Sequence, residues 1–135
     1  MINLDEAKQA LVASEQKAKE LGVSVTTVIV DEHGSIVVVS RMDGAIPISP
    51  RIAFAKAFTS ASLGVPSDGL APNALEGKPY FGVNTILGGE LTPLAGGLPV
   101  IVEGKVTGGI GVGGSMDVSQ DVLCAQAAQG VLQSK

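Results

Sequence analysis

Four charged residues that lie close together in the sequence could bind an anionic ligand. Arg41 and Asp43 come just before a predicted helix that contains Arg51 and Lys56, in a chain with only nine lysines and arginines. Because Arg51 stands in the first turn of that helix, its charge opposes the helix dipole, and a bound carboxylate or phosphate would offset this cost. A salt bridge from Arg41 or Arg51 to an aspartate, tying the loop to the helix, explains the pattern equally well.

The single histidine and the single cysteine offer less chemistry. His33 falls in a predicted turn, where side chains are usually solvated, and it cannot complete a zinc site without other ligands. Cys124 lies in a predicted helix, as a small buried residue would. Because the only histidine sits in a turn, the sequence predicts no Cys-His or Ser-His nucleophilic pair and no metal site.

Glycines recur through residues 108–114, with the sequence GGIGVGG. A dinucleotide-binding loop needs a strand, then the glycines, then a helix, and a phosphate loop needs a lysine followed by serine or threonine. Here the glycines fall inside a predicted strand and no such pair follows. Alternate glycines leave one face of a strand without side chains, so we expect a helix or a flat ligand to approach its backbone closely.

Three helices are predicted from periodicity and capping. Apolar residues recur at helical spacing over residues 3–21, where Asn3 is a natural N-cap. A second, unusually apolar helix is predicted from Ser49, as its N-cap, to about residue 62. The third helix is predicted over residues 117–132, with Asp117 as its cap.

The strands are predicted to pair as hairpins. β-Branched residues at 23–30 and 36–39 flank a turn that ends in glycine, and residues 97–102 and 105–112 form a second hairpin. The stretch 81–97 reads as an irregular loop with one short strand. Strands joined by tight hairpins must be antiparallel, and single strands do not alternate regularly with helices. We therefore expect an α+β fold, as a single domain over residues 1–135.

Composition excludes several classes of function. The net charge is −4 and the sequence pI is about 4.8, which disfavours binding to nucleic acid or to an acidic membrane surface. No apolar run approaches the roughly 20 residues that span a bilayer, and the N-terminus does not read as a signal peptide. One cysteine permits no internal disulfide, which predicts a reducing, cytoplasmic location.

Four segments in order resemble the GlcG/HbpS family of haem-binding and haem-degrading proteins, which is also found as the C-terminal domain of PduO-type corrinoid adenosyltransferases. They are residues 41–45 (RMDGA), 50–60 (PRIAFAKAFTS), 96–100 (GGLPV) and 104–114 (GKVTGGIGVGG). The resemblance covers nearly the whole chain. It implies a profilin-like, five-stranded antiparallel sheet with helices packed on its faces, and homo-oligomers.

The resemblance implies that the chain binds haem or a related tetrapyrrole. Such a ligand needs a flat apolar slot, axial ligands and cations for its propionates. The slot could lie against the glycine-rich strand, with Arg51 and Lys56 on the propionates and with Arg41, Gly96 and Gly97 as further ligand-binding positions. Some members use a histidine of the first helix, which has none here. The remaining candidates for an axial ligand are His33, Met42, Tyr80 and Met116.

An alternative is an enzyme that acts on a small unsaturated or halogenated carboxylic acid, by a tautomerase, dehalogenase or hydratase-like step. Arg51 would clamp the carboxylate with two hydrogen bonds, and Asp43 or Glu90 would move a proton. Backbone amides of Gly96 and Gly97 could stabilise a developing oxyanion. A third hypothesis is an accessory oligomer without chemistry of its own.

Overall fold

In the computed structural model, which describes residues 1–133, the predicted N-terminal helix is α1 (Leu4–Leu21). The side-chain oxygen of Asn3 accepts a hydrogen bond from the backbone N–H of Glu6 at 2.8 Å, and its amide donates to the Glu6 carboxylate at 3.2 Å. Gly22 ends the helix in the left-handed conformation, with a φ of 75°. The predicted N-cap is confirmed, and a left-handed glycine closes the other end of the helix.

Both predicted hairpins are present, and together they form the antiparallel sheet. Its strands are β1 (Thr26–Asp31), β2 (Ile36–Arg41), β3 (Gly97–Val102) and β4 (Lys105–Gly113). They are hydrogen-bonded in the order β2-β1-β4-β3, and every neighbouring pair is antiparallel. The α+β prediction is confirmed, but the sheet has four strands rather than the five expected.

The missing strand was expected in residues 81–97, where the chain instead forms a 3-10 helix, η2 (Val83–Gly89). Three consecutive residues there, Leu87, Gly88 and Gly89, have positive φ values of 56°, 67° and 93°. An extended strand requires negative φ at every residue, so this run of left-handed backbone prevents one from forming.

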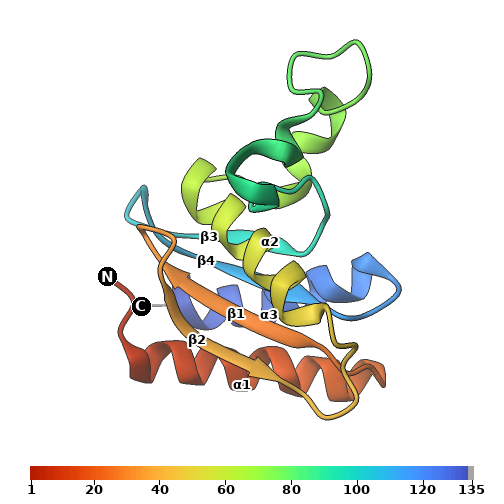
Figure 1. Cartoon of the computed structure of the whole chain (residues 1–135). Helices are drawn as coiled ribbons and strands as arrows, with labels where there is room; N and C mark the ends of the chain where they lie inside the picture. The colour runs from red at the N-terminus through yellow and green to blue at the C-terminus, as the bar shows by residue number, and fades with distance from the viewer. Residues whose placement is uncertain (134–135) are drawn as a thin grey trace.

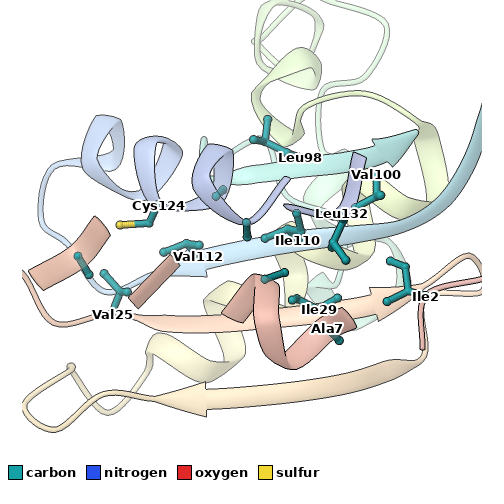
Figure 2. Packing of buried hydrophobic residues seen from close by; sticks show 14 residues of the cluster. Ile2, Ala7, Val25, Ile29, Leu98, Val100, Ile110, Val112, Cys124 and Leu132 are labelled. Carbon is teal, nitrogen blue, oxygen red and sulfur yellow. The ribbon is translucent and has the colours of Figure 1, made fainter. Parts of the chain in front are cut away.

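Helices cover both faces of the sheet (Figure 1). Helices α1 and α3 (Val118–Gln133) pack together on one face, and α2 (Ser49–Leu63) packs on the other. Figure 2 shows the larger core, in which small helix residues meet branched strand residues. Its fully buried strand members are Ile29, Val100, Ile110 and Val112, joined by Val25 just before β1, and its helix members include Ala7, Cys124 and Leu132.

The glycines of β4 bring α2 onto the backbone of the sheet. A Cβ atom on Gly111 would overlap the carbonyl oxygen of Ala53, and one on Gly109 would overlap the carbonyl oxygen of Ala57. Both carbonyls belong to α2, whose alanines face Val28 and Val30 of the neighbouring strand. The close approach predicted from the alternating glycines is confirmed, and a helix makes it.

The start of α2 differs from the prediction by one residue. Ile48 occupies the N-cap position and makes no side-chain capping bond. Ser49, the predicted cap, donates its hydroxyl to the carbonyl of Ile46 at 2.7 Å and lies 2.7 Å from the hydroxyl of Thr26 on β1. Because the Ser49 side chain is used in these bonds, it is not free to cap the helix. Gly64 ends α2 in the left-handed conformation, with a φ of 70°, close to the predicted end at about residue 62.

Residues 65–96, which we call the connecting segment, join α2 to β3 and project beyond the sheet on the α2 side (Figure 1). The segment contains two 3-10 helices, η1 (Ser67–Asn73) and η2. It exposes many large apolar side chains: Val65, Leu75, Tyr80, Phe81, Ile86, Leu87 and Leu94. None of the helices in the described residues is long and apolar enough to cross a membrane.

Candidate ligand-binding site

A small pocket lies where the first turns of α2 meet the end of the connecting segment. It has a volume of about 250 Å³, and we call it the α2 pocket. Apolar side chains form most of its wall, and an arginine and a threonine are the polar side chains at it. The lining residues are Ile48, Arg51, Ile52, Ala55, Gly89, Thr92 and Leu94.

Arg51 is the charged residue of the α2 pocket. Its side chain is exposed in the first turn of α2, which contains no acidic residue. Within residues 1–133 the guanidinium makes no ion pair with a carboxylate, so the aspartate salt bridge considered above is not formed by Arg51. A cation near the positive end of a helix, with no protein anion beside it, favours a bound anion.

A threonine of α2 holds the opposite wall in place. The Thr59 hydroxyl donates to the carbonyl of Ala55 at 2.8 Å and lies 3.3 Å from the carbonyl of Glu90. The same hydroxyl accepts the backbone N–H of Thr92 at 3.0 Å. The backbone of Glu90 is thus tied to α2, while its side chain is exposed and does not line the α2 pocket. Sequence reasoning missed both threonines as site residues. Thr59 lies in the 50–60 segment, but nothing in that segment marks its hydroxyl, and Thr92 lies in none of the four segments.

Lys56 is buried, far from the solvent that a ligand-binding lysine would meet. Only 1% of the residue is exposed, and its ammonium donates to the carbonyl of Val112 at 2.8 Å and to the carboxylate of Asp121 at 3.2 Å. The other oxygen of Asp121 accepts the backbone N–H of Ser115 at 3.1 Å. Burial lowers the pKa of Lys56 and raises that of Asp121, and their mutual attraction opposes both shifts. These contacts favour a structural role for Lys56.

The backbone of Gly96 and Gly97 also lies beneath α2. The N–H of Gly97 donates to the hydroxyl of Ser67 at 2.9 Å, and that hydroxyl donates to the carbonyl of Leu94 at 2.5 Å. A Cβ atom on Gly97 would overlap the carbonyl oxygen of Lys56. The Gly97 amide is therefore already satisfied, and neither glycine lines the α2 pocket.

Arg41 and Asp43 lie at a different place on the surface. The guanidinium of Arg41 donates twice to the carbonyl of Ala45, at 3.0 and 3.2 Å, and so holds the loop that follows β2. With Glu15, Lys19 and Met42, these two residues line a separate hollow of about 360 Å³. The structure thus does not bring Asp43 to the same pocket as Arg51.

None of the four candidate axial ligands lines the α2 pocket. The side chain of His33 is 78% exposed at the tip of the β1–β2 hairpin, and Met116 is 91% exposed. Tyr80 is half exposed on the connecting segment, and the sulfur of Met42 accepts the backbone N–H of Val25 at 3.5 Å. Among the described residues, no group of three His, Cys, Asp or Glu side chains could hold a metal ion.

We expect His33→Ala to change the free energy of unfolding by less than about 0.5 kcal/mol, as for most surface substitutions. Its nearest charged partner is Glu32, 3.5 Å away at the surface. The variant should also keep the haem absorbance spectrum of the parent protein in a haemin titration. A lost Soret band in His33→Ala would contradict this and would make His33 the iron ligand.

Cys124 is not positioned for chemistry. It is fully buried in the core beneath α1, and burial raises the pKa of its thiol to about 11. A thiol that stays protonated is a weak nucleophile and a weak metal ligand, which agrees with the structural role predicted for it.

Comparison with known proteins identifies the family. The family model described as "Haem degrading protein HbpS-like" matches residues 2–129. An uncharacterized 15.0 kDa protein of Citrobacter freundii, encoded between dhaT and dhaS, is 35% identical over 127 residues, which cover 94% of this chain and 89% of that protein.

Solved structures agree in fold over almost the whole chain. The Klebsiella pneumoniae protein ORFY superposes with a TM-score of 0.94 and 34% identity, covering 97% of this chain and 90% of that one. The PduOC–haem complex superposes with a TM-score of 0.91 and 29% identity, covering 96% of this chain and 94% of that one. The match to the family model and the 35% identity to the Citrobacter protein together mean that this chain belongs to the HbpS-like family of haem degrading proteins.

Proposed function

We propose that this protein binds haem or a related tetrapyrrole, with Arg51 on a propionate at the α2 pocket. The observation that carries the proposal is an unpaired guanidinium beside an apolar pocket. The family to which the chain belongs and the haem bound by PduOC support it. Arginine binds carboxylates with two parallel hydrogen bonds, which suits a propionate at the edge of a macrocycle.

The residues of the α2 pocket fit one edge of a tetrapyrrole rather than the whole ring. Its volume of about 250 Å³ is below the range of roughly 300–1,000 Å³ that encloses drug-sized ligands. Its lining contains no imidazole, thiolate or thioether that could bind iron. We therefore assign the propionate to Arg51 and the adjoining alkyl carbons to Ile48 and Leu94, and we assign no residue of the pocket to the iron.

The pocket volume also favours a second candidate, binding of a small carboxylic acid. Arg51 would again hold the carboxylate, as in the enzymatic hypothesis. The two predicted proton carriers do not support a reaction at this place, because Asp43 lines a different hollow and the Glu90 side chain does not line the α2 pocket. The structure therefore supports binding of a small carboxylic acid at this pocket better than it supports a reaction on that acid.

Arg51→Lys should weaken haemin binding about ten- to a hundredfold, the value of one charge-assisted contact. Lysine keeps the charge but cannot make the planar pair of hydrogen bonds. Haemin titration of the folded variant beside the parent measures the effect, and Arg41→Lys is titrated in parallel. If Arg51→Lys binds normally and Arg41→Lys does not, the site belongs to the hollow at Arg41 instead.

We also propose a homo-oligomer, as the family resemblance implies, and the connecting segment gives a structural ground for it. The apolar character of α2 needs no partner, because α2 packs on the glycines of β4 and under the connecting segment. Exposed side chains such as Phe81 and Leu87 on the connecting segment do favour a covering surface, since large apolar patches mark interfaces. Light scattering at micromolar concentration should give more than the monomer mass of 13.6 kDa. A monomer mass would contradict the proposal.

A cytoplasmic location remains a prediction, based on the single cysteine.

A further inference from the structure

Thr92 is one of the residues that line the α2 pocket, and its hydroxyl group has an unused proton. The residue is only 8% exposed, and its oxygen accepts the backbone N–H of Leu94 at 3.2 Å. In the part of the chain that the structure describes, the Thr92 hydroxyl donates no hydrogen bond. A hydroxyl group can donate once while it accepts, so this proton is available to a ligand in the pocket.

Thr59 fixes where that hydroxyl stands. Its own hydroxyl accepts the backbone N–H of Thr92 at 3.0 Å and is itself anchored on the carbonyl of Ala55, one turn earlier in α2. Arg51 stands one turn before Ala55 on the same helix. Helix α2 therefore holds both donors, because it carries Arg51 and anchors the backbone of Thr92. The two residues lie 41 positions apart in the chain. Thr59 acts as a positioning residue.

The size and lining of the pocket set the kind of group that these donors receive. Since a water molecule takes about 30 Å³ in the liquid, a volume of about 250 Å³ holds a group of roughly eight non-hydrogen atoms. Most of the remaining lining is aliphatic, from Ile48, Ile52, Ala55 and Leu94. A carboxylate followed by a short alkyl chain matches both the polar and the apolar parts of this lining.

We infer that the α2 pocket is a carboxylate subsite in which Arg51 and the Thr92 hydroxyl both donate to the carboxylate while the aliphatic wall receives the adjoining carbons. The inference rests on the proposed function, because it places the ligand at the same pocket. It adds Thr92 as a second donor and a carboxylate with a short alkyl chain as the ligand class. The bound carboxylate could belong to a propionate of haem or to a free short-chain carboxylic acid. The subsite is the same for both.

The test compares haemin with haemin dimethyl ester, which has the same ring but no free carboxylate. The parent protein should bind haemin at least tenfold more tightly than the ester. Thr92→Val should lose part of this preference by weakening haemin alone, because Arg51 still binds the carboxylate, and Thr92→Ser, which keeps the hydroxyl, should retain all of it. Thr59→Val should reduce the same preference, which a general loss of stability would not do. Thr107→Val is the matched control, because that threonine bonds to the carbonyl of Val100 and does not line the pocket.

Butanoate serves as the probe for a free carboxylate, measured by calorimetry with the same variants. If haemin does not bind but butanoate binds through Thr92, the subsite stands and the tetrapyrrole proposal fails. If haemin and its ester bind equally and Thr92→Val changes neither, the subsite is overturned while tetrapyrrole binding stands. If neither haemin nor butanoate binds, both proposals are overturned.

Discussion

Asp121→Ala is expected to reduce the free energy of unfolding by about 3–5 kcal/mol, as when one partner of a buried ion pair is removed. The substitution leaves the ammonium of Lys56, which is 1% exposed, with the carbonyl of Val112 as its remaining partner. It also removes the acceptor of the Ser115 N–H, where the chain passes from β4 toward α3. Urea denaturation of the variant beside the parent measures the loss.

The matched control is an ion pair of similar length at the surface. The ammonium of Lys17 lies 3.4 Å from the carboxylate of Glu20, and both side chains are exposed on α1. Glu20→Ala should cost no more than about 1 kcal/mol, since water screens such pairs. The double variant Lys56→Met with Asp121→Leu should recover most of the stability, because it removes both buried charges. If Asp121→Ala and Glu20→Ala reduce the free energy of unfolding equally, the buried ion pair contributes no more to stability than the exposed one.

The buried pair of Lys56 and Asp121 also explains why the sequence suggested Lys56 as a ligand-binding residue. A lysine in an apolar helix is unusual enough to suggest a site, but its partner lies 65 positions away on α3. Nothing local distinguishes a lysine that reaches a buried aspartate from one that reaches a propionate. Ser49 failed as the predicted N-cap for the same reason, because its hydroxyl lies beside Thr26, 23 positions earlier.

Features that depend on neighbouring residues were predictable. The caps of α1 depend on Asn3, Glu6 and Gly22, all within a turn of the helix ends. The β1–β2 turn depends on Asp31, whose carboxylate accepts two backbone N–H groups within four residues. Of the residues that line the α2 pocket, sequence reasoning singled out Arg51, because its place in the first helical turn is a local feature. It did not single out Thr92, whose position depends on a contact with α2 that no local pattern encodes.

Gly111→Ala is expected to cost about 3 kcal/mol in the free energy of unfolding, at the upper end for overpacking a core. A Cβ atom on Gly111 would overlap the carbonyl oxygen of Ala53, which is α2 backbone and cannot rotate away. Its cross-strand neighbours, Val28 on β1 and Gly97 on β3, fix Gly111 from both sides. The added methyl group can be accommodated only if α2 moves off the sheet.

Gly130→Ala is the control, since a Cβ atom on that exposed residue of α3 meets nothing within 4 Å. Alanine is favoured over glycine inside a helix, so this variant should gain about 0.5–1 kcal/mol. Urea denaturation of the two variants and the parent gives both values.

The Gly111→Ala substitution should also affect ligand binding, because α2 carries Arg51 and anchors Thr92 through Thr59. A shift of α2 in Gly111→Ala should therefore weaken haemin binding even under conditions in which the variant is fully folded. If Gly111→Ala changes neither the free energy of unfolding nor the affinity for haemin, the prediction is wrong. The sheet, rather than α2, would then have shifted to accommodate the methyl group.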